Sequence, residues 1–412
     1  MPSLSIPRFR PSLSFAEAAA FVRGLLPWGD DPIAAFERGF SDGDLDGRPV
    51  VLAPSARIAL LWLLEALELE PGDEVVTQAF NFPAVPAAIR AAGATPRFVD
   101  VAGGSFEADW TLLEQALGPR ARVVIVTHLY GNPVDVRPLV ELCTSRGVTL
   151  VEDCAQGIGA SSDRRPVGTF GHGAIFSLGP TKNLTLLGGG AVAVEDGELA
   201  RRLAARASAH RRKGLPGACA LAAKGGFLWA ATHPLLFTLL VLPLLRLLES
   251  RGVDLVHRVM EERGFELTGV ERSLRPSRPM AAVGCAQLRW LAARNRARVR
   301  NGWYLRSLLV ERGEIGELEV PPMREGSVFM SFPVLHPRRQ ALARALRARG
   351  VDTDFGFMAD CSNLDPGAAS GAGLPHAARA AREVLHLPVH PLLGKRHLDR
   401  IAEAVRAVAG AV

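Results

Sequence analysis

The chain has 412 residues, of which 48% are hydrophobic, and its 48 basic and 42 acidic side chains give a formal net charge of +6. This length allows a large core and more than one subdomain, and this composition excludes an intrinsically disordered chain. The mild positive charge is spread over helical stretches, which indicates solvated surfaces and argues against a nucleic-acid partner.

The five cysteines are scattered and form no Cys-x-x-Cys pair. This pattern predicts neither a metal site nor a disulfide framework, and it favours a reducing compartment. Residues 1–8 contain no continuous apolar stretch that would act as a signal peptide, so we expect a cytoplasmic protein. We assign residues 1–44 to an N-terminal segment and residues 45–279 to the large domain.

Short apolar runs alternate with amphipathic stretches from Pro49 to Val194. The predicted strands are 49–53, 74–77, 96–101, 122–127 and 149–152, and the predicted helices are 56–69, 84–92, 110–117 and 136–146. This alternation predicts a mainly parallel sheet that is covered by helices on both faces. Ligands bind such sheets at the carboxyl ends of the strands, where Asp153 and the turn at Ser55 both fall.

One lysine has an informative setting. Lys182 follows the run Phe176-Ser177-Leu178-Gly179-Pro180-Thr181 and precedes three consecutive glycines, 188–190, while Asp153 closes an earlier apolar run. A lysine amine forms a Schiff base with the aldehyde of pyridoxal phosphate, and a carboxylate keeps the pyridine nitrogen protonated so that the ring accepts electrons. Either residue alone would be ordinary, but together they indicate a pyridoxal phosphate enzyme.

An apolar segment lies within residues 211–278, which form a predicted insertion in the large domain. Residues 226–245 are predominantly apolar, and a run of about 20 such residues is long enough to cross a bilayer. The chain on both sides belongs to one fold, so a single crossing is excluded, and Pro234 and Pro243 interrupt a straight helix. We therefore predict a proline-interrupted helical element over 226–248.

Two interpretations of this segment remain open. It is either a hydrophobic helical hairpin at a subunit interface or a monotopic element that dips into one leaflet. Basic residues flank it and would meet anionic headgroups in the second case: Lys213, Lys224, Arg246 and Arg251.

Residues 280–412 are predicted to hold a linking helix and a small α+β C-terminal domain. The helix is expected over 280–309, the strands over 332–335 and 385–389, and further helices over 338–349 and 397–408. We find no internal repeat.

A series of motifs along the chain resembles the DegT/DnrJ/EryC1/StrS family of sugar aminotransferases. The motifs include Ser55-Ala56-Arg57, Ala79-Phe80-Asn81-Phe82, His128-Leu129-Tyr130-Gly131, Glu152-Asp153-Cys154-Ala155-Gln156, the Lys182 run and residues 385–391. The resemblance implies an aspartate-aminotransferase-like large domain of pyridoxal phosphate fold type I. It also implies a homodimer, because this family builds each site from two subunits.

The resemblance assigns a role to each matching residue. Lys182 and Asp153 would be catalytic, and Phe82 and Gln156 would contact the cofactor ring, although a core role for Phe82 is an alternative. The cofactor phosphate would bind at the helix start formed by Ser55, Ala56 and Arg57 and at the hydroxyl of Ser177. Arg57 stands where the family more often has threonine and is expected to make a charge-assisted contact. His128 is either structural or close to the substrate.

A lysine at position 182, rather than the histidine of the dehydrating subset, implies transamination. Glutamate is the expected donor, and a keto sugar on a nucleotide or lipid carrier is the expected acceptor. Two family motifs do not match, at Ser277-Arg278-Pro279 and at Gly356-Phe357, which weakens the case for a standard nucleotide sugar. The alternatives are an aminotransferase for a membrane-embedded keto lipid and a non-catalytic, cofactor-binding membrane or regulatory protein. Peripheral attachment to the inner membrane face is expected with the cytoplasmic location.

Overall fold

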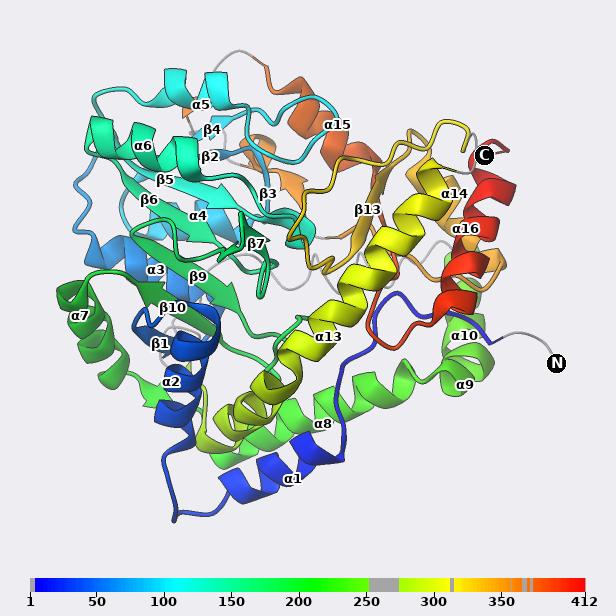
Figure 1. The fold of residues 1–412 in the computed structure, drawn as a ribbon, viewed down its shortest axis with the longest axis horizontal. Coiled ribbons are helices and arrows are strands. Elements are labelled where there is room, and N and C mark those ends of the chain that lie inside the picture. Colours follow the sequence, from blue (N-terminus) through cyan, green and yellow to red (C-terminus); the bar gives the residue numbers. More distant parts are fainter. Residues whose placement is uncertain are drawn as a thin grey trace.

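A central eight-stranded sheet dominates the computed structural model, which describes residues 4–251, 274–311, 315–356, 358–364, 369–370 and 373–411 (Figure 1). The strand order is β1-β10-β9-β6-β5-β2-β4-β15. The strands are β1 Val50–Ala53, β2 Glu74–Gln78, β4 Thr95–Val99, β5 Ala121–Thr127, β6 Thr149–Asp153, β9 Gly173–Ser177, β10 Gly190–Val194 and β15 Ala369–Ser370. Strand β10 pairs antiparallel with β1 and β9, and the other neighbouring pairs are parallel. The predicted mainly parallel sheet is therefore confirmed.

Helices cover both faces of this sheet. Val123 and Ile125 of β5 join a core with α3 (Ala56–Ala66), α4 (Ala84–Ala91) and α7 (Gly197–Ser208), as the side chains of alternate residues point to one face. The intervening Val124 and Val126 pack with α5 (Trp110–Ala116) and α6 (Arg137–Arg146) on the other face. Burial on both faces explains why the strands read as continuous apolar runs.

The N-terminal segment contains two helices that the sequence analysis did not specify. Helix α1 (Phe15–Gly24) begins with a capping box between Ser14 and Glu17, and α2 (Pro32–Asp44) packs Phe36 and Phe40 against the large domain. In addition, short strands β11 (Arg211–Arg212) and β12 (Leu274–Arg275) pair, as do β7 (Ser161–Ser162) and β8 (Arg165–Pro166), and β3 (Phe80–Asn81) and β14 (Ala359–Asp360).

Helix α13 (Arg278–Val310) runs from the large domain to a second core. That core contains the antiparallel pair β13 (Phe332–Leu335) and β16 (Val384–Leu387) with α14 (Arg339–Ala348) and α16 (Lys395–Ala409), as the sequence predicts. Helix α15 (Pro375–Glu383) and the short helices η1 (Leu129–Gly131) and η3 (Cys361–Leu364) complete the described chain. The limits 45–279 and 280–412 stay a prediction, because α13 contributes to both cores.

The apolar segment forms a bent helical arm below the sheet, which we call the apolar arm (residues 215–250; Figure 1). It consists of α8 (Leu215–Ala231), α9 (Pro234–Leu236), the π-helical turn η2 (Phe237–Val241) and α10 (Leu242–Ser250). Pro234 lies in the first turn of α9, where a missing N–H is tolerated, and Pro243 follows directly on the π-helical turn η2.

No single helix among the described residues has the length and hydropathy to cross a membrane. The pair Leu215–Ala231 and Pro234–Glu249, bent by 68°, meets these criteria jointly. Residues 252–273 of the predicted insertion lie outside the described part of the chain. Whether the arm contacts a second subunit or a membrane leaflet stays a prediction.

Candidate active site

Asp153 ends β6 at the carboxyl edge of the sheet. It pairs in register with Thr127 of β5 and Ile175 of β9, so the ends of three parallel strands meet there. The carboxylate is 4% exposed, and its Oδ1 accepts a hydrogen bond of 2.9 Å from the Ala155 amide. Burial raises the pKa of Asp153, while the Ala155 amide and the Lys182 cation lower it. Such a buried carboxylate suits a ligand that brings a positive charge.

Lys182 lies in the loop between β9 and β10. The Leu178 amide donates to the Gly189 carbonyl at 3.0 Å, and Asn183 Nδ2 donates to Asn295 Oδ1 of α13 at 3.1 Å, so the loop is held at both ends and in its middle. The amine Nζ lies 3.7 Å from Met330 Sδ. Burial lowers the pKa of Lys182 to about 8, even though the Asp153 charge raises it. A lysine of this kind carries a substantial neutral, nucleophilic fraction near neutral pH.

Gly190 brings two predicted phosphate-binding elements together. It pairs with Ala53 of β1 on one side and with Ser177 of β9 on the other. A Cβ atom at this position would lie 2.4 Å from the carbonyl carbon of Ser55 and 2.4 Å from the nitrogen of Ala56. Glycine therefore allows the start of α3 to approach the sheet this closely.

The start of α3 is built as an anion site. Ser55 is the N-cap, and its Oγ accepts a hydrogen bond of 3.3 Å from the Ile58 amide. Ser55, Ala56 and Arg57 are half-buried. The first amides of a helix lack intrahelical partners and lie at its positive end, so they suit a phosphate dianion.

The residues expected at the cofactor ring lie at the same edge. Gln156 Oε1 accepts a hydrogen bond of 2.9 Å from the Tyr130 amide, and Gln156 Nε2 lies 3.6 Å from Met358 Sδ. The amide of the half-buried Phe82 donates to Asn81 Oδ1 at 2.8 Å. Hydrogen bonds with neighbouring residues thus hold Gln156 and Phe82 in place, and their contacts with the cofactor ring stay predictions.

His128 makes the contacts of a structural residue, and proximity to the substrate stays a prediction. Its side chain is fully buried, its Nδ1 accepts from the Val134 amide at 3.0 Å, and its Nε2 lies 3.1 Å from Glu152 Oε2. Glu152 also accepts from the amides of Gly168, Phe170 and Gly171, each at 2.8 Å. Burial raises the pKa of Glu152, but the His128 and backbone hydrogen bonds bring it below its usual value.

The same pair lies within reach of Cys154, and the potential metal ligands of these three buried residues lie within 4.8 Å of one another. However, the hydrogen bonds above occupy both His128 nitrogens and both Glu152 oxygens. This cluster therefore positions the loop after β6 and is not built to hold a metal ion.

The described residues at the two mismatched motifs lie against other parts of the same chain. Arg278 NH1 lies 3.3 Å from Asp31 Oδ1, within the same chain. Gly356 has a φ of +70°, and a Cβ atom there would lie 2.3 Å from Cε1 of His386. Phe357 lies outside the described residues.

Sequence reasoning missed several neighbours of the site. Met330 contacts the Lys182 amine from a loop 148 positions away, and Asn295 holds the lysine loop from the middle of α13. Neither residue type signals such a role. The sequence placed Gly190 only in a glycine run, since neither β10, which contains it, nor the adjacent β9 was predicted as a strand.

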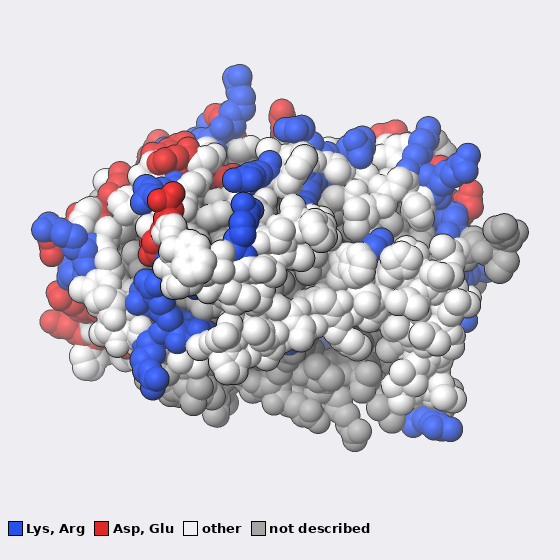
Figure 2. Space-filling model, turned by 90° about the horizontal axis from the view of Figure 1, so that it is seen from below, with Lys and Arg blue, Asp and Glu red and all other residues white. Residues whose placement is uncertain are grey.

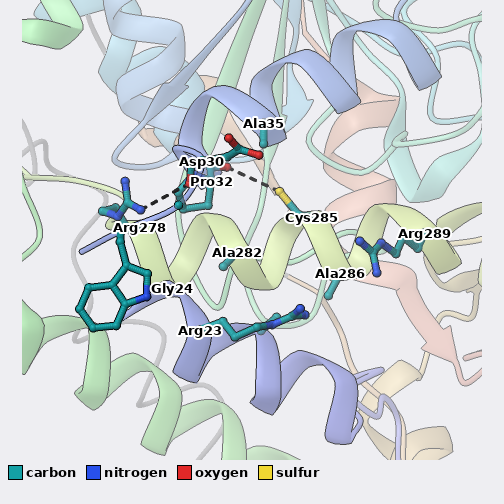
Figure 3. A pocket seen from close by; sticks show the side chains of 13 residues that line it. Arg23, Gly24, Asp30, Pro32, Ala35, Arg278, Ala282, Cys285, Ala286 and Arg289 are labelled. Atoms are coloured by element: carbon teal, nitrogen blue, oxygen red, sulfur yellow. Dashed lines mark hydrogen bonds between the residues drawn. The ribbon is translucent and has the colours of Figure 1, made fainter. Parts of the chain in front are cut away.

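A separate cavity of about 360 Å³ lies between α1, α2 and α13 (Figure 3). Arg23, Arg278 and Arg289 line it together with Trp28 and Asp30. None of the predicted site residues lines this cavity, so it is distinct from the constellation around Lys182.

The sequence model of the DegT/DnrJ/EryC1/StrS aminotransferase family matches residues 28–217 and 245–406. The chain belongs to this family. The match is interrupted over 218–244, which falls within the apolar arm.

Two relatives and one solved structure illustrate the similarity. The chain is 31% identical over 351 residues to UDP-N-acetyl-3-dehydro-alpha-D-glucosamine 3-aminotransferase of Acidithiobacillus ferrooxidans, which covers 84% of this chain and 81% of the relative. It is 32% identical over 358 residues to dTDP-3-amino-3,4,6-trideoxy-alpha-D-glucose transaminase of Micromonospora megalomicea, again covering 84% and 81%. The aminotransferase TlmJ of Streptoalloteichus hindustanus superposes with a TM-score of 0.75 at 28% identity and covers 98% of each chain.

The predicted family, fold type I and aminotransferase class are therefore confirmed, and pyridoxal phosphate is the cofactor of the family. The geometry fits that cofactor. The site offers a partly neutral lysine amine, a buried carboxylate and a helix N-terminus brought to the sheet by a glycine, which match an aldehyde, a protonated ring nitrogen and a phosphate.

Proposed function

We propose that this aminotransferase moves the amino group of glutamate to a keto sugar carried on a nucleotide or a lipid, with Lys182 and Asp153 as its catalytic residues. One observation carries the proposal above all. The Lys182 amine, whose pKa is lowered to about 8, is electrostatically coupled to the buried Asp153 at the carboxyl edge of a fold-type-I sheet.

Bound pyridoxal phosphate would supply an aldehyde and an electron-accepting ring. The Lys182 amine would take the proton from the α-carbon of the amino donor and later return a proton to the acceptor carbon. The Asp153 carboxylate would hold a positive charge in a buried position. Ser55, Ala56, Arg57 and Ser177 would bind the phosphate, and Phe82 and Gln156 would orient the ring.

The names of the two relatives support a keto sugar as the acceptor, since both describe aminotransfer to sugars linked to a nucleoside diphosphate. The lipid carrier and the membrane-embedded keto lipid remain part of the proposal because the two mismatched motifs and the apolar arm distinguish this chain. We further propose a homodimer in the cytoplasm, peripheral to the inner membrane face. All five cysteines are free, which agrees with a reducing compartment.

The first test locates the cofactor. The full-length protein is incubated with pyridoxal phosphate, treated with borohydride, and digested for mass spectrometry. We expect the label on the peptide that contains Lys182. The variant Lys182→Ala should lose both label and turnover but keep its fold, whereas Lys395→Ala, at an exposed lysine on α16, should keep both. Label on another lysine in the unmodified protein would overturn the assignment.

The second test concerns the substrate. The loaded enzyme is mixed with glutamate, and the visible-edge absorption band of the cofactor should bleach as 2-oxoglutarate is released. UDP- and dTDP-linked keto sugars are then added to recover the band. A band that does not respond to glutamate or any other amino donor would refute aminotransfer.

A further inference from the structure

The outer sides of α1 and the apolar arm form one exposed apolar surface, which we call the apolar face. Phe15 of α1 is 88% exposed, and Phe227 and Leu240 of the arm are 71% and 64% exposed. The other exposed large apolar residues of these elements and the loop after α1 are Val22, Leu25, Leu26, Trp28, Leu215, Trp229, Leu235, Leu236, Leu239, Leu244 and Leu247. Figure 2 views the molecule from below, and the middle of this side is almost free of described charged side chains.

The side of the arm that faces away from the protein is apolar, whereas the outward side of a water-soluble surface helix is polar. The fully buried residues of α8 are Ala218 and Gly225, whereas the large side chains of Phe227 and Trp229 point outward. Gly225 lets α8 approach the lysine loop, because a Cβ atom there would lie 2.8 Å from Leu187 Cδ2. An amphipathic surface helix buries its large apolar residues and exposes polar ones. Small residues against the protein and large ones outward are typical of helices that face lipid.

Helix α1 continues the same surface. Phe15 and Val22 are spaced by seven residues and lie on one side of the helix, while Ala20 and Gly24 are buried, and the exposed Leu26 follows in the loop after it. The two parts are joined: the guanidinium of Arg10 lies 5.8 Å from the centre of the Trp229 ring, and Leu13 approaches the position of a Gly225 Cβ within 3.5 Å.

The two threonine hydroxyls of the arm are satisfied within the protein. Thr232 Oγ1 donates to the Leu228 carbonyl at 2.6 Å, and Thr238 Oγ1 donates to the Pro234 carbonyl at 2.6 Å and accepts from the Ser5 amide at 2.7 Å. Self-satisfied polar groups are what a hydrocarbon environment requires.

The outward charges on these helices have one sign. Glu17 of α1 is 2% exposed and pairs with Arg294 at 2.8 Å, and Glu249 of α10 pairs with Arg347. The exposed charged residues on the described part of α1 and the arm are all basic: Arg23, Lys224 and Arg246. Arg246 also donates to the carbonyls of Arg347 and Ala348. Arg23 also lines the arginine-rich cavity between α1, α2 and α13 (Figure 3).

We propose that the apolar face seats this enzyme on an anionic lipid bilayer, with α1 and the arm lying in the outer part of one leaflet. The basic side chains on α1 and the arm complement anionic headgroups, and the exposed Asp30 in the loop after α1 is the acidic residue beside them. A second copy of this chain is the competing occupant, and the test below distinguishes it from a bilayer. The proposal gives the peripheral location a defined surface and adds α1 to it. It does not rest on the aminotransferase reaction, since binding is measured without substrate.

The test is co-sedimentation of the full-length protein with vesicles of phosphatidylcholine, alone or mixed in equal parts with phosphatidylglycerol. We expect binding to the mixed vesicles that weakens with salt. Two triple variants probe the two parts of the face: Phe227→Ser, Leu239→Ser and Leu240→Ser in the arm, and Phe15→Ser, Val22→Ser and Trp28→Ser at α1. Each triple variant should bind at least about a hundredfold more weakly.

A matched control replaces three exposed leucines outside the face with serine, Leu112, Leu364 and Leu392, and should bind as the unmodified protein does. Retention of the cofactor absorption band shows that each variant is folded. Binding that is unaffected by the arm variant refutes the proposal, and binding lost only in the arm variant refutes the role of α1. Failure of the unmodified protein to bind vesicles, with an arm variant that dissociates into monomers in analytical ultracentrifugation, would show that the face joins two copies of the chain.

Discussion

The lowered pKa of Lys182 predicts how the rate of cofactor capture depends on pH. The neutral amine is the form that attacks an aldehyde. With a pKa of about 8, about a tenth of the amine is neutral at pH 7 and about nine tenths at pH 9. An ordinary lysine with a pKa of 10.4 would be about 0.04% neutral at pH 7, so burial raises the reactive fraction at that pH by about 200-fold.

The assay mixes cofactor-free enzyme with pyridoxal phosphate in a stopped-flow instrument and follows the visible-edge absorption band over a pH series at constant ionic strength. The second-order rate constant should rise through a midpoint near pH 8 and level off above it. A free lysine derivative with a blocked α-amine, measured in the same buffers, gives the titration of the cofactor itself for correction.

The variant Asp153→Asn tests the direction in which the Asp153 charge shifts the pKa of Lys182. The Asp153 charge raises the pKa of Lys182, whereas burial lowers it. Removal of that charge should therefore move the midpoint below that of the unmodified enzyme. A midpoint above pH 10 would show that the amine is not desolvated. A shift to higher pH in the variant would show that the amine is not close to this carboxylate.

Three further substitutions test other parts of the site. Asp153→Asn should retain some cofactor but lose several orders of magnitude in turnover; a loss below about tenfold, or about 1.4 kcal/mol, would mean that another residue holds the ring nitrogen. Arg57→Ala should raise the cofactor dissociation constant more than it lowers the saturated rate, and an unchanged dissociation constant, measured by equilibrium dialysis, would place Arg57 elsewhere. Gly190→Ala should cost about 1–3 kcal/mol of stability in denaturant titration and weaken cofactor binding, because its Cβ would meet the backbone of Ser55 and Ala56. Gly197→Ala, where a Cβ would meet nothing within 4 Å, is its matched control and should be near neutral.

Strands β9, β10 and β15 were not predicted from the sequence. Strands β1, β2, β4, β5 and β6 were predictable because they are largely buried on both faces. Residues such as Val123 to Val126 must then be apolar without alternation, and turn residues mark where such runs end. The placement of Asp153 and Ser55 followed from the rule that parallel strands end at one edge. The contact between Lys182 and Met330 was not predictable, since it depends on where a distant loop folds back.

The orientation of the apolar arm could not be predicted from its composition either. When nearly every position is apolar, hydrophobic periodicity does not indicate which side of a helix faces the protein. The inward side is set by the close approach that Ala218 and Gly225 permit, and this became visible only in the folded chain. Helix α1 was missed for a related reason: an alanine-rich stretch forms a helix without a strong amphipathic signal.

Helix α13 has a consequence for how the protein unfolds. Its first half places Met280 and Leu291 in the core beside the lysine loop, and its second half places Leu305 and Leu308 in the core of the C-terminal part. Melting either half would therefore fray a helix on which the other core depends, and Asn295, near its middle, would release the lysine loop at the same time. Because α13 contributes to two separate cores, it couples their unfolding, so hydrogen exchange in α13 should report a single cooperative unit that includes the active site.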